Sequence, residues 1–407
     1  MANTALPVSL SVLQLQLHGS VVGHLLRQPS GATALVFDPA WVNAADRCTL
    51  TLCGTPLHPQ HKALFSRPWL RGEGLHPLPA NLLPETGLRP ALQQHLQLPV
   101  DDDFLLLAAL GAALPGGWHI RPLTADAIPP GVLDFNARVS IVTPTPVLPA
   151  GLRAFAGSQP KLVTTAHQVL KLATTPGQTR NQYSALQLAR IAGVDCVDHT
   201  LVPADSTGTL LLPAAVADEP VLAVQRFDRS SDGLPIHSED FAQVLFKPPH
   251  EKYNQCDAAL LGRLLYRYTP HGLKNVQEFA RRLLVNVLLG NGDQHLKNWS
   301  LRYPDGHSAE LAPAYDLAFT QALGIAERPL AIAGCRDWYA LEFRHFEEWS
   351  RAVGVPWRVI RPVLLDSVER ARTLWPAALE ALPMAETDKL LLRYHWKNLG
   401  KKLQYGL

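Results

Sequence analysis

The chain reads Gly290-Asn291-Gly292-Asp293-Gln294-His295-Leu296-Lys297-Asn298-Trp299-Ser300 directly after a stretch with the apolar spacing of a helix. Few other stretches hold so many side chains of the kinds that bind ligands. Asp293 and Asn298 are five residues apart, the spacing at which phosphoryl-transferring enzymes place an Asp for the acceptor hydroxyl and an Asn for magnesium. Asp316 follows, where such enzymes carry a second metal-binding carboxylate. The segment therefore predicts an ATP-dependent phosphotransferase.

The composition is that of a globular protein. Its 407 residues are 47% hydrophobic and 18% charged, which is enough for two or three cores. The net charge of +2 means that the surface as a whole does not indicate nucleic-acid binding. Five cysteines without a C-x-x-C pair indicate free thiols in a reducing cytosol. We see no signal peptide, and the most apolar run, 104–114, is far shorter than the roughly 20 residues that span a bilayer, so we expect a cytoplasmic protein with no membrane partner.

Hydrophobic periodicity predicts an α+β fold that becomes mostly helical towards its C-terminus. Alternating apolar residues predict strands at 8–17, 21–26, 33–37, 168–173 and 221–224. Helical spacing predicts helices at 88–98, 102–114, 181–191, 240–245, 257–268 and 276–289, with several more in 346–403. Proline-rich stretches and the change to helical spacing predict three parts, 1–117, 118–228 and 229–407.

Lys171 lies inside one of the apolar strands. A charge on a buried strand is costly unless it is paired, and in kinases a strand lysine contacts the ATP phosphates. The alternative is a lysine on an edge strand that reaches water. His295 and Lys297 also have two interpretations each. His295 binds either the loop's own carbonyls or a phosphate or metal, and Lys297 binds either the transferred phosphoryl group or solvent.

Two further segments are weaker signals. Gly157-Ser158-Gln159-Pro160-Lys161 has one glycine, so it is neither a Walker A loop nor the glycine-rich loop of protein kinases. Only its position before the Lys171 strand suggests that it covers phosphates. Near the C-terminus, four basic residues at helical spacing form a predicted ridge that faces either solvent or an acidic partner such as DNA. They are Lys389, Arg393, Lys397 and Lys401.

Several segments together resemble the HipA family of bacterial serine/threonine kinase toxins. The resemblance rests on 291–300 with Leu311-Ala312-Pro313-Ala314-Tyr315-Asp316-Leu317, on 157–161, on Asn181-Gln182-Tyr183, on Val224-Gln225-Arg226-Phe227-Asp228-Arg229, and on Asn81-Leu82-Leu83-Pro84-Glu85-Thr86-Gly87. The match spans nearly the whole chain, and the combination of motifs makes it specific.

The resemblance implies a bilobal protein-kinase-like fold with an extra N-terminal mixed α/β subdomain and a mostly helical C-terminal lobe. It implies three groups of site residues. Asp293 is the catalytic base, with His295 and Lys297 beside it. The ATP-binding residues are Gly157, Ser158, Gln159, Lys161 and Lys171, with Gln225 and Phe227 along the adenine. Asn298 and Asp316 hold Mg²⁺.

The resemblance also implies partners and regulation. Members of the family are neutralised by a small helix-turn-helix antitoxin, HipB-like, which also binds operator DNA. Known members phosphorylate aminoacyl-tRNA synthetases, which halts translation and produces dormancy, the state called persistence. Ala154 stands where the family often has an autophosphorylated serine, and Ser158 is a possible substitute. Gln182 stands where glutamate is common, which would weaken an ion pair with Lys171.

Other functions stay open at this point. Gly292-Asp293-Gln294-His295 also fits a small-molecule phosphotransferase that acts on aminoglycosides or choline. Gln182 and the basic ridge fit a weakly catalytic protein that acts with its partner as a DNA-bound corepressor. A metallophosphatase is a third possibility, but the further Asp and His blocks that a two-metal site needs are absent from the sequence.

Overall fold

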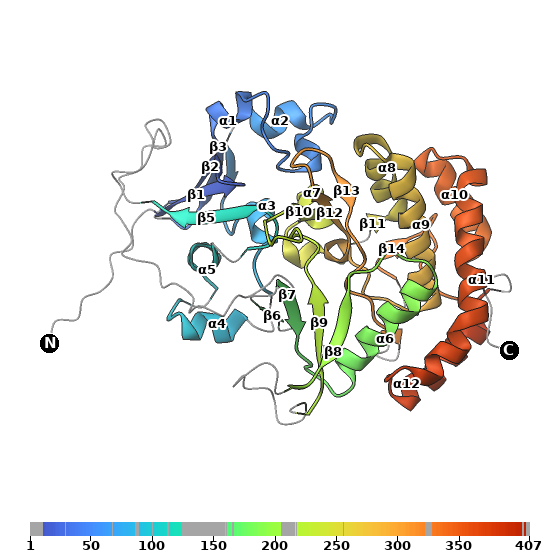
Figure 1. The fold of residues 1–407 in the computed structure, drawn as a ribbon. Helices are drawn as coiled ribbons and strands as arrows, with labels where there is room; N and C mark the ends of the chain where they lie inside the picture. Colours follow the sequence, from blue (N-terminus) through green and yellow to red (C-terminus); the bar gives the residue numbers. More distant parts are fainter. Residues whose placement is uncertain are drawn as a thin grey trace. The chain divides into compact units, whose positions relative to one another are not determined.

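The computed structural model describes residues 11–28, 30–66, 68–85, 89–99, 101–111, 114–123, 159, 161–164, 167–204, 216, 218–254, 256–321, 328–400 and 403. The chain forms two compact units (Figure 1). The first contains Met1–Thr165, Asp228–Pro249 and Tyr303–His307, and the second contains Ala166–Phe227, His250–Arg302 and Ser308–Leu407. The units thus alternate along the sequence, and each is described by itself below.

The first unit is built on a five-stranded antiparallel sheet in the order β4-β3-β2-β1-β5. The strands are β1 (Ser11–Leu17), β2 (Ser20–Arg27), β3 (Thr33–Phe37), β4 (Trp69–Arg71) and β5 (Trp118–Pro122). His18 and Gly19 join β1 to β2 with φ values of 48° and 82°, and two-residue hairpin turns require such left-handed backbone. The three predicted N-terminal strands are confirmed, whereas β4 and β5 lie where the sequence analysis predicted no strand.

Short helices complete the first unit's core, in which Leu13, Leu15 and Leu17 pack with leucines of the other elements. These helices are α1 (Pro39–Asn43), α2 (His61–Phe65), α3 (Pro77–Ala80), α4 (Arg89–His95), α5 (Asp103–Leu110) and α7 (Phe241–Val244). The Asp102 carboxylate accepts a hydrogen bond of 2.9 Å from the Leu105 amide, so this side chain caps the N-terminus of α5, within the predicted helix 102–114. The strands β6 (Lys161–Val163) and β10 (His237–Asp240) also belong to this unit.

The second unit begins with an antiparallel sheet that carries Lys171. Its strands β7 (Gln168–Lys171), β9 (Val221–Gln225) and β8 (His199–Val202) are paired in that order. α6 (Gln178–Ile191) follows β7 and packs against β8 and β9. The predicted strands and helix are confirmed here, and β8 is an addition that the sequence analysis lacked.

The rest of the second unit is mainly helical. Its helices are α8 (Ala258–Tyr268), α9 (Gly272–Leu288), α10 (Phe343–Val353), α11 (Trp357–Ala381) and α12 (Glu386–Asn398). Short strands β11 (Cys256–Asp257), β13 (Glu310–Leu311) and β14 (Leu330–Ala331) accompany them, and β12 (Ser300–Tyr303) runs from the second unit into the first. α8 packs against α9 and α10, and α11 packs against α9 and α6 (Figure 1). The predicted α+β class with a helical C-terminal part is confirmed.

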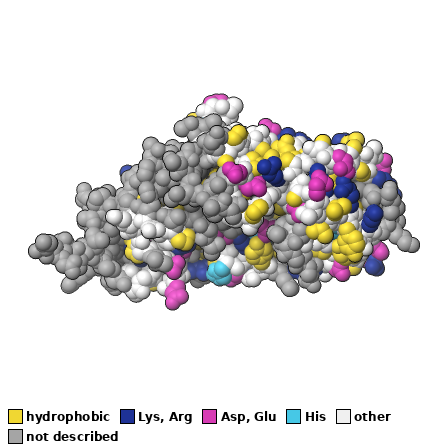
Figure 2. Space-filling view, turned by 90° about the horizontal axis from the view of Figure 1, so that it is seen from below, with side chains coloured by type: hydrophobic (Ala, Val, Ile, Leu, Met, Phe, Trp, Pro, Cys, Tyr) yellow, Lys and Arg dark blue, Asp and Glu magenta, His cyan; other side chains and the backbone are white. Residues whose placement is uncertain are grey.

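Two residues of the predicted basic ridge, Lys389 and Arg393, are paired within α11 and α12, whereas Lys397 is exposed and Lys401 lies outside the described residues. Lys389 is only 4% exposed and its ammonium donates to Glu386 at 2.8 Å, while Arg393 pairs with Glu380. The lysine stem is buried in the helix interface, and both charges are largely neutralised. Figure 2 shows Lys and Arg interspersed with acidic and hydrophobic side chains on the described part of the face it presents.

Candidate active site

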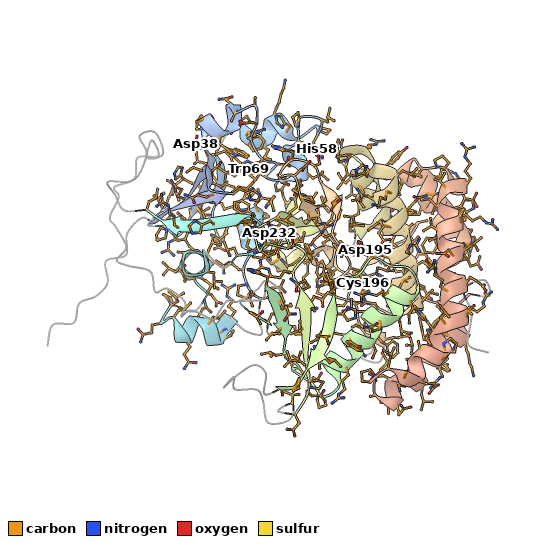
Figure 3. The ribbon with its side chains drawn as sticks, in the orientation of Figure 1. Asp38, His58, Trp69, Asp195, Cys196 and Asp232 are labelled. Carbon is orange, nitrogen blue, oxygen red and sulfur yellow. The ribbon has the colours of Figure 1, made fainter. Side chains whose placement is uncertain are left out.

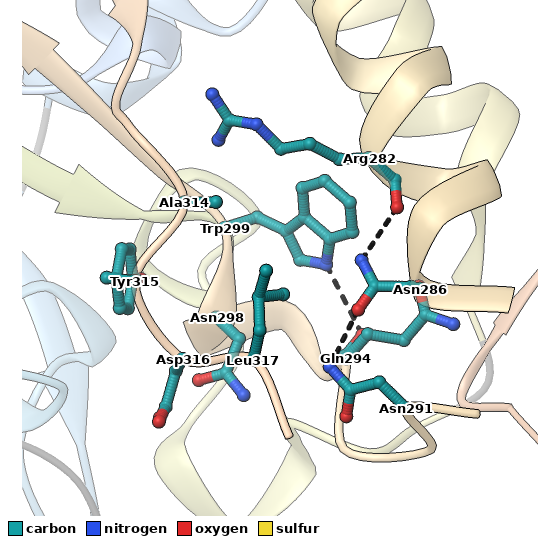
Figure 4. A pocket seen from close by; sticks show the side chains of 10 residues that line it. All are labelled: Arg282, Asn286, Asn291, Gln294, Asn298, Trp299, Ala314, Tyr315, Asp316 and Leu317. Atoms are coloured by element: carbon teal, nitrogen blue, oxygen red, sulfur yellow. Dashed lines mark hydrogen bonds between the residues drawn. The ribbon is translucent and has the colours of Figure 1, made fainter. Parts of the chain in front are cut away.

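α9 presents two polar side chains, one turn apart, to the loops that follow it. Arg282 donates through Nη1 to the carbonyl of Ala312 at 2.6 Å, and Asn286 accepts a hydrogen bond of 2.6 Å from Nδ2 of Asn291. Residues four apart lie on one face of a helix, and both side chains are buried. One face of α9 therefore holds both loops of the predicted site (Figure 4).

The loop after α9 is fixed by its own hydrogen bonds. Gly290 has a φ of 63°, a left-handed conformation that favours glycine. The amide of Gly292 donates to Thr320 Oγ1 at 2.6 Å. The amide of Asp293 donates to Asn291 Oδ1 at 3.0 Å. Asn291 thus bridges the helix and Asp293, so the carboxylate is presented from a rigid backbone.

Asp293 and Asn298 are brought together by the loop. Asn298 donates through Nδ2 to the Asp293 carbonyl at 2.6 Å, and the turn between them is closed by two backbone bonds of 2.9 Å at His295. The Asp293 side chain is 38% exposed. A carboxylate held on an ordered loop and open to solvent can accept a proton from a bound hydroxyl.

Lys171 forms a buried ion pair with Asp316. Its ammonium lies 2.6 Å from Asp316 Oδ1 and 3.4 Å from the carbonyl oxygen of Tyr315. Lys171 is 3% exposed, so this carboxylate offsets the cost of burying its charge. Lys171 is therefore paired, as its place in an apolar strand predicted. The alternative, a lysine that reaches water, is wrong.

A backbone pairing positions the segment that carries Asp316. Asp195 and Cys196, labelled in Figure 3, lie between α6 and β8 and run beside Ala314. The Ala314 amide donates to the Asp195 carbonyl at 2.8 Å, and the Val197 amide donates to the Ala314 carbonyl at 3.0 Å. Burial raises the pKa of the Cys196 thiol to about 12, so this cysteine acts as a packed side chain rather than a nucleophile.

Asn298 and Asp316 line the same small cavity (Figure 4). The cavity has a volume of about 10 Å³, room for roughly one water molecule. In the described part of the chain, no group of three or more His, Cys, Asp or Glu could hold a metal ion. The amide and carboxylate oxygens of this pair suit Mg²⁺, which commonly takes its other ligands from phosphates and water.

His295 is neutral at physiological pH. Burial, with a smaller contribution from Lys252, lowers the pKa of His295 to about 3, and its Nε2 lies 3.9 Å from Asp293 Oδ1. Any catalytic contribution of His295 is therefore by hydrogen bonding and not by positive charge. Lys297 is 7% exposed, which excludes the alternative that it is simply solvated.

The predicted adenine-facing residues lie at the end of β9. The Gln225 amide donates to the Asp198 carbonyl at 2.8 Å. The ring of Phe227 lies 5.2 Å from that of Tyr315, at a tilt of 30°. This contact connects the β9 end with the residue next to Asp316, so the predicted adenine and metal regions adjoin within the second unit.

The remaining predicted residues either lie outside the described residues or are described by the unit or helix that holds them and by their burial. Gly157 and Ser158 lie outside the described residues, as does Ala154. Gln159 and Lys161 belong to the first unit, and Lys161 is buried. Gln182 is buried on α6. The carboxylate beside Lys171 comes from Asp316, so the ion pair shown here does not depend on a glutamate at 182.

Sequence reasoning missed three side chains that shape the site. Asn286 and Thr320 hold the loop, and Tyr253 donates a hydrogen bond of 2.5 Å to Asp293 Oδ1. Asn286 gave no clear signal, because an asparagine in a predicted helix is ordinarily exposed. Tyr253 gave no signal, since it lies forty residues before Asp293 in a segment without a motif.

These side chains define the class of the protein. A buried strand lysine is paired with one acidic residue, and a second acidic residue lies on a loop after a helix, five residues before an asparagine. On an α+β kinase-like fold, this arrangement is that of a kinase, an enzyme class that uses nucleotides.

Comparisons with known proteins identify the family. The HipA N-terminal domain matches residues 13–121, and the HipA-like C-terminal domain matches residues 154–375. The protein named "Putative kinase Y4dM" of Sinorhizobium fredii is 32% identical over 397 residues, covering 92% of this chain and 94% of that protein. "Putative kinase Y4mE" of the same organism is 30% identical over 353 residues, covering 77% and 79%.

A solved structure shares the fold. The complex of HipA, HipB and operator DNA from the Shewanella oneidensis MR-1 toxin–antitoxin system matches with a TM-score of 0.66 at 18% identity, covering 94% of both chains. The present chain belongs to the HipA family, as the sequence resemblance predicted. None of the helices that the structure describes combines the length and apolar character needed to cross a lipid bilayer.

Proposed function

We propose that this protein is a serine/threonine protein kinase that transfers the γ-phosphoryl group of ATP to a protein hydroxyl. The observation that carries the proposal is the Lys171–Asp316 ion pair at 2.6 Å, because it places a cation beside the residue expected to bind the metal. Phosphoryl transfer depends mainly on positioning and on neutralising phosphate charge. Lys171 supplies a positive charge for the phosphates, and the side chains of Asn298 and Asp316 supply oxygen atoms for the metal.

Each residue has a distinct role in this proposal. Asp293 accepts the proton of the acceptor hydroxyl as that oxygen attacks the γ-phosphorus in line with the leaving ADP. Lys171 orients the α- and β-phosphates. Asn298 and Asp316 would hold Mg²⁺, which when bound neutralises phosphate charge. Gln225 and Phe227 lie along the adenine, and Lys297 contacts the transferred group with His295 supporting the loop. Gly157, Ser158, Gln159 and Lys161 form the phosphate-covering segment.

We further propose that the protein is the toxin of a toxin–antitoxin pair. Membership of the HipA family supports a HipB-like helix-turn-helix antitoxin as its partner and operator DNA as a ligand contacted mainly through that antitoxin. A translation factor such as an aminoacyl-tRNA synthetase is the expected substrate. Its phosphorylation would halt translation in the cytoplasm and produce persistence. Phosphoproteomics after induced expression tests this, because the substrate is then the protein whose phosphorylation rises before growth stops.

The alternative of a small-molecule phosphotransferase makes a different prediction. Such an enzyme would turn over ATP rapidly with aminoglycosides, choline or sugars and would leave proteins unmodified. A screen of these acceptors against a bacterial lysate, with γ-labelled ATP, separates the two functions. The corepressor alternative is weakened at two of the four ridge residues, because Lys389 and Arg393 are already paired with acidic residues.

A further inference from the structure

The hydroxyl of Tyr253 occupies the position on Asp293 that an acceptor hydroxyl would take. Tyr253 Oη donates to Asp293 Oδ1 at 2.5 Å. A candidate general base must lie within about 2.6–3.2 Å of the atom whose proton it removes, and this contact is at least that close. Both side chains reach solvent, since Tyr253 is 50% exposed and the Asp293 side chain is 38% exposed. The hydroxyl therefore lies beside the proposed base, in a contact between two partly exposed side chains.

The tyrosine ring is held in this place by the same loop. It packs against the His295 ring in a T-shaped arrangement, with 4.8 Å between centroids and 85° between planes. Lys252 Nζ lies 5.3 Å from the centre of the Tyr253 ring, and the Lys252 carbonyl accepts a hydrogen bond of 3.2 Å from the Leu296 amide. The turn that carries Tyr253 is thus attached to the catalytic loop through backbone and side chains.

Tyr303 provides an internal comparison. Its hydroxyl also donates to a carboxylate, Glu239 Oε1, at 2.5 Å. Tyr303 is 1% exposed and Glu239 is 2% exposed, so no phosphate donor can reach that hydroxyl. Tyr253 combines the same contact with exposure and with a carboxylate on the proposed catalytic loop.

We propose that Tyr253 is a phosphoryl acceptor within its own chain, a modification site on the acceptor side of the active site. The inference rests on the proposed kinase function. Tyr253 Oη forms a bond to the γ-phosphorus of ATP, and the bond from that phosphorus to the β,γ-bridging oxygen breaks. ADP leaves, and the phenolic proton passes to Asp293 Oδ1. The products are phosphotyrosine at 253, ADP and one proton.

The modification has a direct consequence for the site. A phosphate on Tyr253 carries between one and two negative charges at neutral pH, and it would lie close to the Asp293 carboxylate. Like charges at this distance repel, so the phosphorylated side chain must leave its present hydrogen bond. Each chain therefore carries out this reaction once, and afterwards the Tyr253 side chain no longer occupies its place beside Asp293.

Mass spectrometry of the full-length protein tests the proposal. Phosphatase-treated protein is incubated with ATP and Mg²⁺, and phosphorylated residues are mapped by tandem mass spectrometry over time. We expect phosphate at Tyr253, at a first-order rate that does not change when the protein concentration is varied tenfold. Tyr253→Phe keeps the ring and its contacts but removes this phosphate. Tyr394→Phe, which changes a tyrosine that is 64% exposed on α12, keeps it.

Two results separate the inference from the function on which it rests. If the protein phosphorylates Ser158 or a lysate protein while Tyr253 stays unmodified, Tyr253 is only a structural partner of Asp293 and the inference is wrong. If no γ-phosphoryl group reaches any residue, lysate protein or small acceptor, the proposed kinase function itself fails. Asp293→Asn should slow Tyr253 phosphorylation by about 10²–10⁴-fold, the usual contribution of a general base.

Discussion

At the scale of single residues, the carboxyl group of Glu239 in the first unit has an unusual titration. It accepts hydrogen bonds from the Tyr303 hydroxyl and the Leu52 amide. Burial nevertheless raises its pKa from 4.5 to about 7. The nearby His237 is buried, and burial lowers its pKa to about 4. His237 is therefore uncharged near neutral pH, whereas Glu239 is about half protonated at pH 7, because burial disfavours its charged form.

Glu239 should make the stability of the protein depend on pH. Its folded pKa lies above its unfolded value, so its contribution is complete below about pH 4.5 and is lost as the pH rises through 7. The loss should amount to about 3 kcal/mol. Glu239→Gln should remove this loss, so that the variant unfolds at a higher urea concentration than the wild type at pH 8. If the urea midpoints of the two proteins change with pH in the same way between pH 5 and pH 8, the raised pKa assigned to Glu239 is wrong.

The sequence predicted that Lys171 needs a negatively charged partner, but not which residue that partner is. A lysine within an apolar strand requires a compensating charge, and the kinase-like order of motifs indicated phosphate. The Asp316 carboxylate is 145 residues away in sequence, and no periodicity links such distant positions. The order of the motifs predicted both residues of the pair, but only the folded chain shows that they contact each other.

At the scale of elements, α9 organises the candidate active site. Its apolar face was evident from Phe279, Leu283 and Val287, which are all fully buried. Its polar residues Arg282 and Asn286 hold the segments on either side of β12. The loop spacing was readable because it is local. The support from α9 was not, because an arginine or asparagine in a helix is ordinarily exposed.

Asn291→Ala tests whether this support matters for catalysis. The substitution removes the bonds to Asn286 and from the Asp293 amide, and leaves the buried Asn286 side-chain oxygen without this donor. We expect a cost of about 1–3 kcal/mol in unfolding free energy and a fall in kcat of up to about a hundredfold, because Asp293 is displaced. The KM for ATP should change little. Steady-state kinetics and urea unfolding measure the two effects.

The control for this experiment is Asn398→Ala. Asn398 donates to the carbonyl of Tyr394 at the exposed end of α12, so it is an asparagine with a local bond and no connection to the loop. It should leave kcat unchanged. If Asn291→Ala loses stability but keeps the wild-type kcat, the asparagine bridge supports the fold and not the chemistry.

At the scale of the whole molecule, the predicted class and family are confirmed, and the predicted three-part division stays a prediction. Residues 228–249 and 303–307 belong to the first compact unit although they lie far along the chain. Composition and periodicity describe neighbours in sequence, so they cannot predict that a segment will join a distant unit. The missed strand β5 has the same cause, since it pairs with β1 a hundred residues earlier.

Nucleotide binding should stabilise the molecule through the second unit. A ligand that binds only the folded state adds about 2.7 kcal/mol at a concentration of 100 times its Kd. A non-hydrolysable ATP analogue with Mg²⁺ should therefore raise the Tm by several degrees. Lys171→Ala and Asp316→Asn should each reduce that rise, while Asp232→Ala, on an exposed turn of the first unit, should retain it. An equal rise in all four proteins would show that the nucleotide binds elsewhere.

The most direct test of the central claim is transfer of γ-labelled phosphate by the Asp293→Ala protein. The substrate mixture is a bacterial lysate, the control is Asp232→Ala, and thermal unfolding establishes that both variants are folded. The proposed mechanism predicts that wild type and Asp232→Ala label protein, whereas Asp293→Ala loses about 10²–10⁴-fold in rate and no longer inhibits growth. Labelling by Asp293→Ala at the wild-type rate would contradict the assignment of this loop as the catalytic centre.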